Sequence, residues 1–390
     1  MDFNIRIFIT LFLAVFSTTA GVGLVAPLLP VYAHELGAGA FQIGLIFGAF
    51  SLSRSIFVPY FGKLSDMKGK KPFLTSGLFI YFILSICYVF STNVQLLIIL
   101  RLGQGFASAM ILPVAQAYVG TITPPHREGF IMGLFNMALY GGLSIGPMLG
   151  GYVKDWFNIQ FSFLSMASLT LFGFLLCLLL LPSETGYKSN KNSPLNKPIR
   201  YLTLIKEPVV FSLFTFRVCF TIGIGIIWTF LPLMASTRIE LSSSSIGIVV
   251  MINVLISGLL QTPMGFLADR FSKQFLIITG GVLAAASISY LNTAISFKQL
   301  FLANGILGLA GGISFPAVMA LGVIEGRRTD AMGSVMGLLA MAHSLGMLIG
   351  PLLGGLLLDC FSFTAVFIFG TLTLIAGILI FIGLYGTKIK

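Results

Sequence analysis

The sequence predicts an all-α polytopic membrane protein with twelve transmembrane helices in two pseudo-symmetric bundles of six. Of the 390 residues, 57% are hydrophobic and only 9% are charged, whereas about 25% of the residues of a soluble domain are charged. Twelve apolar runs are long enough to span a membrane, since a spanning helix needs roughly 20 apolar residues. Motifs of the first half return about 203 positions later, which indicates an internally duplicated chain.

The predicted spans follow the apolar runs in order. The first run is too long for a signal-peptide core and is not followed by a convincing cleavage site, so we interpret it as a span. An even number of spans places both termini on one side of the membrane. The twelve predicted spans cover residues 5–30, 41–62, 73–91, 94–118, 129–153, 160–181, 208–234, 243–266, 275–296, 298–323, 331–357 and 361–386.

One long polar segment, residues 182–207, divides the chain. We expect an N-terminal six-helix bundle over 1–181, a flexible cytoplasmic linker over 182–207 and a C-terminal six-helix bundle over 208–390. The linker contains Lys188, Lys191, Lys197, Arg200 and Lys206. Contact of these basic residues with anionic lipid is the alternative to a fully solvated linker.

The distribution of basic residues predicts the orientation. The net charge is +11, and 17 of the 23 Lys and Arg lie in segments assigned to one side. Three lie on the other side and three inside apolar runs. The positive-inside rule accounts for this distribution and places both termini in the cytoplasm, in an inner or plasma membrane. It also makes nucleic acid an unlikely reason for the positive charge, so no nucleic-acid partner is expected.

A dense charged motif lies between the second and third spans. It runs from Gly62 to Lys71, and its Gly62 and Asp66 recur as Gly265 and Asp269. Asp66 lies beside the negative end of its own helix dipole, which is unfavourable unless a cation or another helix N-terminus compensates it. Gly69 allows a tight turn. The lysines of the motif, among them Lys70 and Lys71, are expected on the cytoplasmic side, and a plain topology signal is the alternative interpretation.

A second motif, G-x-x-x-G-P-x-x-G-G, occurs in the fifth and the eleventh span. Glycines four residues apart form a bare stripe where another helix can approach closely. Proline frees a backbone carbonyl and permits a bend. The motif residues are Gly142, Gly146, Pro147, Gly150 and Gly151 in the first copy and Gly346, Gly350, Pro351, Gly354 and Gly355 in the second.

With these motifs the chain resembles the major facilitator superfamily over essentially its whole length. Gly62 to Lys71 resembles the superfamily's loop signature, and Arg101 to Ala107 resembles its fourth-helix signature. Gly142 to Gly151 resembles the fifth-helix signature of the drug:proton antiporter branch. The resemblance implies a major-facilitator-type fold, a conformational latch at Asp66, a pliable helix at Gly146 and Pro147, and a cavity-lining, proton-responsive Arg101. The second loop motif departs from the pattern at Ser272 to Gln274, so we expect the first copy to matter more.

Polar residues within the spans predict a central cavity. Ionisable groups at membrane depth are functional candidates, and polar faces of apolar helices point to a cavity rather than to lipid. Ordinary helix packing is the alternative for each residue. The cavity and substrate candidates are Arg54, Arg101, Gln116, Asn136, Tyr140, Arg217, Trp228 and Asn253.

The proton-coupling candidates are Glu35, Asp66 and His343. His343 is the one side chain at mid-depth with an ordinary pKa near neutrality, although a hydrogen-bonded structural histidine is the alternative. All twelve Asp and Glu lie in loops or near span ends. Many cation-drug antiporters of the resembled branch carry a deep carboxylate in the first helices, and this chain has none there.

These observations predict a secondary active transporter that works by alternating access, with proton-coupled efflux of small amphiphilic compounds or drugs as the preferred function. The alternative is a carrier for an anionic metabolite or a lipid-linked sugar, with cavity arginines binding the anion. The sequence offers no convergent catalytic set, no metal-site spacing and no GxxxxGK[ST] motif, so we expect no enzyme, metal, cofactor or ATP drive. The proton gradient is the expected energy source, the surrounding lipid the expected environment, and a monomer suffices.

Overall fold

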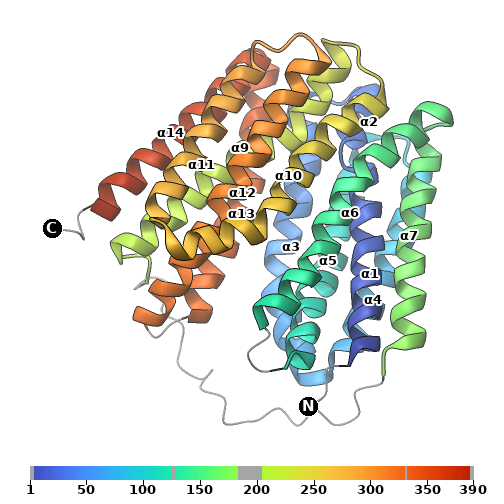
Figure 1. Ribbon diagram of the computed structural model, residues 1–390. Coiled ribbons are helices and arrows are strands. Elements are labelled where there is room, and N and C mark those ends of the chain that lie inside the picture. The colour runs from blue at the N-terminus through green and yellow to red at the C-terminus, as the bar shows by residue number, and fades with distance from the viewer. Residues whose placement is uncertain (1–3, 125–127, 183–203, 330–331, 387–390) are drawn as a thin grey trace. The chain divides into compact units, whose positions relative to one another are not determined.

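The computed structural model describes residues 4–124, 128–182, 204–329 and 332–386. Every regular element in these ranges is helical, as the sequence predicts (Figure 1). The helices of the first half are α1 (Ile5–Val25), α2 (Leu28–Glu35), α3 (Ala40–Lys68), α4 (Lys70–Val89), α5 (Val94–Ile122), α6 (Glu128–Trp156) and α7 (Ile159–Leu180). Those of the second half are α9 (Pro208–Thr237), α10 (Ser243–Arg270), α11 (Lys273–Leu291), α12 (Phe297–Arg328), α13 (Met332–Cys360) and α14 (Phe363–Gly386).

Among the described residues, twelve helical segments are long and apolar enough to cross a membrane. Each corresponds to one of the predicted spans, so the twelve-helix prediction is confirmed. The first segment, Ile5–Glu35, consists of α1 and α2 together. Pro27 separates the two helices because its ring cannot continue the hydrogen-bond ladder of α1.

The charged motif between the second and third spans is helical, which corrects the predicted span ends at 62 and 73. α3 continues to Lys68 and α4 begins at Lys70. Charged side chains do not end a helix where water can solvate them, so the helices run beyond their apolar parts. Only Gly69 interrupts them, with φ 88° and ψ 154°, a conformation essentially restricted to glycine.

The chain divides into two compact units. Unit 1 comprises Met1–Ala38, Ala49–Lys191 and Glu240–Met251, and unit 2 comprises Gly39–Gly48, Asn192–Ile239 and Ile252–Lys390. The start of α3 therefore belongs to unit 2 and the start of α10 to unit 1. Each half of the sequence contributes the beginning of one helix to the unit formed mainly by the other half.

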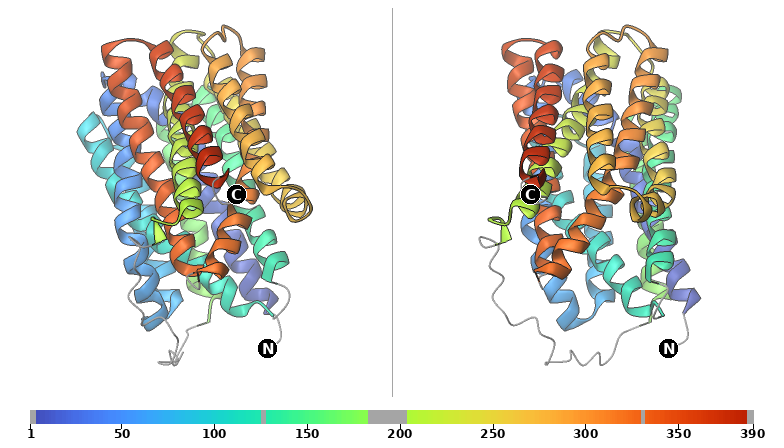
Figure 2. Two further views of the ribbon diagram at one scale, coloured as in Figure 1. Left: turned by 90° about the vertical axis from the view of Figure 1, so that its left-hand side faces the viewer. Right: turned by 60° about the vertical axis from the view of Figure 1, so that its left-hand side comes forward.

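The helices of the two halves pack in matching pairs. In unit 1, α1 packs against α6 and α7, and α4 packs against α5 and α7. In unit 2, α9 packs against α13 and α14, and α11 packs against α12 and α14, with α14 in red beside α9 in yellow-green (Figure 2). Each contact of the first half thus has its counterpart in the second, as expected for a duplicated architecture.

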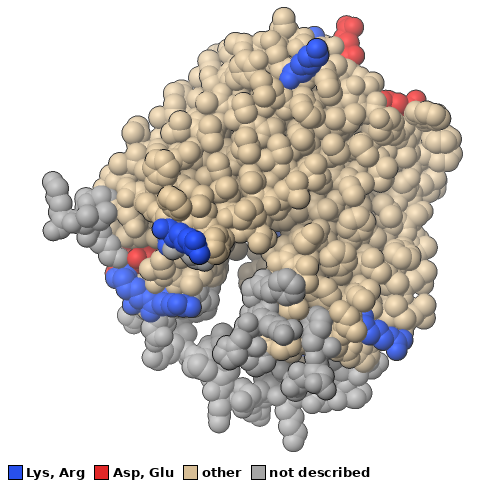
Figure 3. Space-filling model, in the orientation of Figure 1, with Lys and Arg blue, Asp and Glu red and all other residues tan. Residues whose placement is uncertain are grey.

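The surface has the character of a lipid-facing protein. Large apolar side chains are exposed within the helices, such as Ile99 at 62% and Leu259 at 67%. On the face shown in Figure 3 most of the described surface is tan, with only a few Lys, Arg, Asp and Glu side chains. Such exposure is unfavourable in water and favourable against lipid tails.

Candidate functional site

The glycine motif of α6 forms a close helix crossing with α1. A Cβ atom at Gly146 would overlap the carbonyl of Ala20, and one at Gly150 would overlap the carbonyl of Leu24. A Cβ atom at Gly142 would lie 2.5 Å from the carbonyl oxygen of Phe16. Only glycine permits this backbone approach, so the stripe predicted from the sequence is a helix-packing surface.

The glycine motif of α13 forms the same crossing with α9. A Cβ atom at Gly346 would lie 2.6 Å from the carbonyl oxygen of Val218, and one at Gly350 would overlap the carbonyl of Ile222. The two prolines are equivalent as well. Gly23 of α1 lies against the Pro147 ring, and Gly225 of α9 lies against the Pro351 ring.

The motif prolines also contact helices that begin in the other half of the sequence. A Cβ atom at Gly247 of α10 would overlap the carbonyl of Pro147, and one at Gly44 of α3 would overlap the carbonyl of Pro351. Each Gly-Pro helix is therefore enclosed between two helices, α1 and α10 for α6, and α9 and α3 for α13.

Arg101 of α5 lies in a buried polar cluster of unit 1. Its side chain is 6% exposed and donates from Nη1 to Oε1 of Gln104 at 3.2 Å. The same oxygen accepts from the hydroxyl of Tyr88 at 3.1 Å. The guanidinium also lies 5.7 Å from the centre of the Phe50 ring. The arginine is thus held at a fixed position among α3, α4 and α5.

Arg217 and His343 meet in unit 2. Nη2 of Arg217 on α9 lies 3.4 Å from Nδ1 of His343 on α13. The guanidinium lies over the ring of Phe315 on α12, 4.4 Å from its centre. The sequence singled out both residues separately, and the structure brings a cavity candidate into contact with a proton-coupling candidate.

The other cavity candidates occupy varied environments. Asn253 of α10 is buried, and its Nδ2 donates to the backbone carbonyl of Asn304 at 3.2 Å. This bond favours a helix-packing role for Asn253. The remaining candidates are all half-buried, namely Arg54, Gln116, Asn136, Tyr140 and Trp228.

The acidic candidates lie at helix ends. Glu35 is the last residue of α2, is 51% exposed and pairs with Nζ of Lys154 at 2.9 Å. The side chains of Asp66 and Asp269 lie outside the described part of the structure. In the same motif, Lys71 donates from Nζ to the carbonyl of Leu181, and Lys70 is buried.

Sequence reasoning missed a role for Asp155 and Asp359. The carboxylate of Asp155 accepts from the backbone N–H groups of Ser243 and Ser244, which begin α10. That of Asp359 accepts from the N–H groups of Ala40 and Phe41, which begin α3. Their matched positions after the fifth and eleventh spans are visible in the sequence, but their partners are not.

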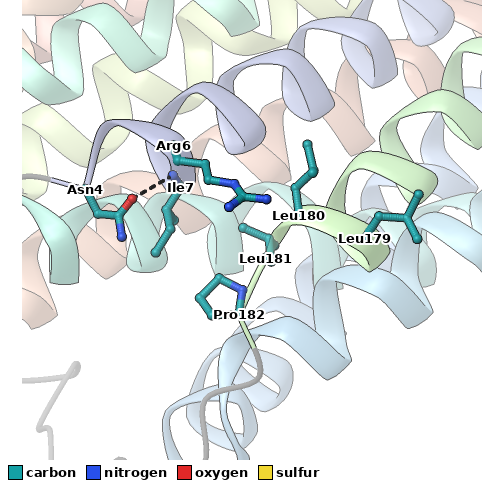
Figure 4. A pocket seen from close by; sticks show the side chains of 7 residues that line it. All are labelled: Asn4, Arg6, Ile7, Leu179, Leu180, Leu181 and Pro182. Atoms are coloured by element: carbon teal, nitrogen blue, oxygen red, sulfur yellow. Dashed lines mark hydrogen bonds between the residues drawn. The ribbon is translucent and has the colours of Figure 1, made fainter.

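The structure also contains a pocket of about 280 Å³ between the start of α1 and the end of α7 (Figure 4). Asn4 caps α1 there, accepting from the N–H of Ile7 at 3.2 Å, and Arg6 and three leucines complete much of the wall. None of the cavity candidates lines it. Within the described residues, no group of three His, Cys, Asp or Glu could hold a metal ion.

Comparison with known proteins identifies the family. The model of the Major Facilitator Superfamily matches residues 11–242 and 213–389. An uncharacterized MFS-type transporter of Methanocaldococcus jannaschii is 31% identical over 366 residues, which are 92% of this chain and 94% of that protein. Quinolone resistance protein NorA of Staphylococcus aureus is 26% identical over 364 residues, 91% of this chain and 90% of NorA.

Solved structures share the fold at low sequence identity. The nucleoside transporter NupG superposes with a TM-score of 0.80 at 14% identity, covering 97% of this chain and 100% of that one. The human organic anion transporter MFSD10 superposes with a TM-score of 0.68 at 17% identity, covering 98% and 100%. The chain belongs to the Major Facilitator Superfamily. It is a membrane transporter and not an enzyme.

Proposed function

We propose that this transporter couples the inward movement of protons to the export of small amphiphilic compounds by alternating access. The observation that carries the proposal is the twin crossing of α6 on α1 and α13 on α9, both made by a G-x-x-x-G-P-x-x-G-G string. Such a bare, proline-containing helix can bend and slide against its neighbour without losing side-chain contacts. The relatives named for quinolone and multidrug resistance support export of this substrate class.

Proton coupling is supported by the contact between Arg217 and His343. In this proposal Nδ1 of a neutral His343 ring accepts from the guanidinium, because a guanidinium carries only donors. A protonated ring has no acceptor and repels the guanidinium. Proton binding to His343 therefore breaks the contact and changes the relation of α9 to α13. Glu35 and Asp66 remain further candidates for the same step.

The other charged residues on the helices around this pair lie at helix ends. α13 contacts the start of α3, and it packs against α9, α12 and α14. The other charged residues of α9, α12, α13 and α14, namely Lys298, Glu325, Arg327, Arg328 and Asp359, lie in first or last turns.

In this proposal the two sequence halves, 1–181 and 208–390, rock about a cavity near the middle of the membrane. The residues proposed to line it are Arg54, Arg101, Gln116, Asn136, Tyr140, Arg217 and Trp228. The Gly62–Lys71 motif and its second copy latch the cytoplasmic side. Both termini lie in the cytoplasm and a monomer completes the cycle.

A second candidate is transport of an anionic substrate. It rests on the arginines inside the spans, since Arg101 is buried and Arg217 lies over an aromatic ring. Guanidinium groups bind carboxylate and phosphate in a bidentate manner. The structural neighbours named for nucleosides and organic anions extend the range of substrates to be tested.

The experiment is a substrate panel in proteoliposomes with an imposed pH gradient. Cationic, neutral and anionic compounds are added in turn and proton flux is recorded. The proposal predicts substrate-dependent proton flux with cationic or neutral amphiphilic compounds. Flux with anions alone contradicts it and favours the second candidate. Transport without any proton flux contradicts the proposal that protons are the coupling ion. It does not contradict the assignment of the protein as a transporter.

A further inference from the structure

Two carboxylates bind the starts of two helices from the opposite half of the sequence. We call each of these two contacts a clasp. In the first clasp, Oδ1 and Oδ2 of Asp155 accept from the N–H groups of Ser243 and Ser244 at 3.0 and 2.7 Å. In the second clasp, Oδ1 and Oδ2 of Asp359 accept from the N–H groups of Ala40 and Phe41 at 2.7 and 2.8 Å (α13 and α3 in Figure 1). Each carboxylate uses both oxygens on consecutive amides.

The geometry suits a carboxylate. The first N–H groups of a helix have no partner within the helix, and the dipole of the helix favours a negative charge at this end. A bidentate carboxylate satisfies two of these donors at once. An asparagine in its place accepts only with Oδ1, and its NH₂ group opposes the second N–H.

Helix starts are usually capped by a residue a few positions away, and local groups are present here as well. The hydroxyl of Ser242 accepts from the N–H of Ser245, and the side chain of Gln42 accepts from the N–H of Gly39. Yet the two clasps use carboxylates 88 and 319 residues away. Local helix stability alone does not call for such distant partners.

Both clasps join the two halves of the chain on the same side of the membrane. Asp155 is at the end of α6 and Asp359 at the end of α13, and each helix is followed by one more span. The first of these spans leads to the linker and the second to the C-terminus, so the clasps lie on the side opposite the linker and the C-terminus. The overlaps of Gly247 with Pro147 and of Gly44 with Pro351 lie one to two turns further along the same helices.

We propose that Asp155 and Asp359 are positioning residues of the transport cycle, which hold the membrane side opposite the linker closed and release their helix starts together when that side opens. This inference rests on the alternating-access part of the proposed function and not on the substrate or on protons. Rocking of one half against the other separates α6 from α10 and α13 from α3 in a single motion, because each pair joins the two halves. The exposed amides then pass to water, which keeps the cost of opening moderate.

The test places spin labels at Phe157 and Glu240 in a variant without the four native cysteines, and measures their distance by pulsed electron resonance. Both positions are exposed and flank the first clasp. Asp155→Asn, Asp359→Asn and the double variant are compared with Lys154→Gln. The control removes an ion pair with Glu35 one residue from Asp155, but both of its partners belong to the first half.

Each single Asp→Asn variant is expected to raise the ratio of long to short distances about fivefold to tenfold, in line with the strength of a carboxylate at a helix N-terminus. In the double variant the increase of this ratio should approach the product of the two single increases. Lys154→Gln should leave the ratio unchanged. Asp359→Asn is the decisive variant. Asp359 belongs to the second clasp, yet joint release requires that its replacement raise the ratio of long to short distances measured at the first clasp. A change confined to the mutated clasp, or none, overturns the proposal.

A second measurement needs no substitution. Amide hydrogen exchange of the wild-type protein reports the opening of residues 40–43 and 243–246 separately. Joint release predicts protection that rises and falls in parallel in both segments when ligands shift the transport cycle. Opposite or unrelated changes contradict joint release. Neither the spin-label distance nor the amide exchange depends on proton flux in liposomes. A failure of joint release can therefore be distinguished from a failure of proton coupling.

Discussion

Nη2 of Arg217 lies 3.4 Å from Nδ1 of His343, across the contact between α9 and α13. The same guanidinium lies over the Phe315 ring. A histidine, an arginine and an aromatic ring from three helices thus form one cluster in unit 2. Because only the neutral ring can accept from arginine, the protonation state of His343 decides whether α9 and α13 are joined by this bond.

Replacement of His343 by Gln should uncouple transport from the pH gradient. The amide oxygen of Gln can accept from Arg217 but does not take up a proton near neutral pH. We expect pH-driven transport to fall by about tenfold or more, while downhill exchange at equal pH persists. His34→Gln is the matched control, since His34 is exposed at the end of α2. Equal pH-driven rates in His343→Gln and the wild type would falsify the role of this histidine.

Gly146→Ala should separate α6 from α1. The added methyl group overlaps the carbonyl of Ala20 and lies 2.8 Å from the backbone nitrogen of Leu24. Backbone cannot move aside as a flexible side chain can, so we expect a loss of thermal stability of about 1–3 kcal/mol and a lower transport rate. Thermal unfolding in detergent and uptake in vesicles measure the two effects.

The control for Gly146→Ala is Gly133→Ala in the same helix. Nothing lies within 4 Å of a Cβ atom at Gly133. Alanine has a higher helix propensity than glycine by about 1 kcal/mol, so Gly133→Ala should be neutral or slightly stabilising. Equal destabilisation by both variants would show that the α1 contact is not the cause.

Gly69→Ala should strain the junction of α3 and α4. With φ 88° and ψ 154°, this residue occupies a region that is costly for any side chain, on the order of 1–3 kcal/mol. Gly120→Ala in α5, where the added methyl group meets open space, is the comparison. A difference in melting temperature of several degrees between the two variants is expected. Matching values would mean that α3 and α4 join with other backbone angles.

Arg54→Gln and Arg217→Gln separate the two substrate classes. If the transported compounds are cationic or neutral, removal of a guanidinium should change their apparent affinity by less than about threefold, since no charge pair is lost. An anion that binds these arginines should lose about tenfold or more. Competition uptake with one compound of each class provides the measurement, and weakened binding of anions alone would favour the anion carrier.

The spans could be predicted because their signal is local. Each apolar run is long enough to cross a membrane by itself, and each has its helix in the structure. The ends were less predictable. α3 continues through Lys63 and Lys68, because hydropathy marks where lipid ends and not where the hydrogen-bond ladder ends.

The glycine strings predicted a close helix approach but not the partner helix. Gly146 meets Ala20, about 126 positions earlier, because α6 packs on α1. The pairing of Arg217 with His343 likewise depends on how α9 and α13 are rotated against each other, which no single helix encodes. The two clasps show the same limit. The matched positions of Asp155 and Asp359 can be seen in the sequence, but their partners Ser243 and Ala40 cannot.

Proton movement driven by a substrate gradient alone shows directly whether transport is coupled to protons. Proteoliposomes loaded with an amphiphilic compound are diluted into compound-free buffer of the same pH, and the internal pH is followed with a trapped dye. Proton-coupled exchange predicts a pH change that requires the protein, scales with the substrate gradient and is abolished in His343→Gln. Substrate leaving through the protein with no pH change in the wild type would contradict proton coupling.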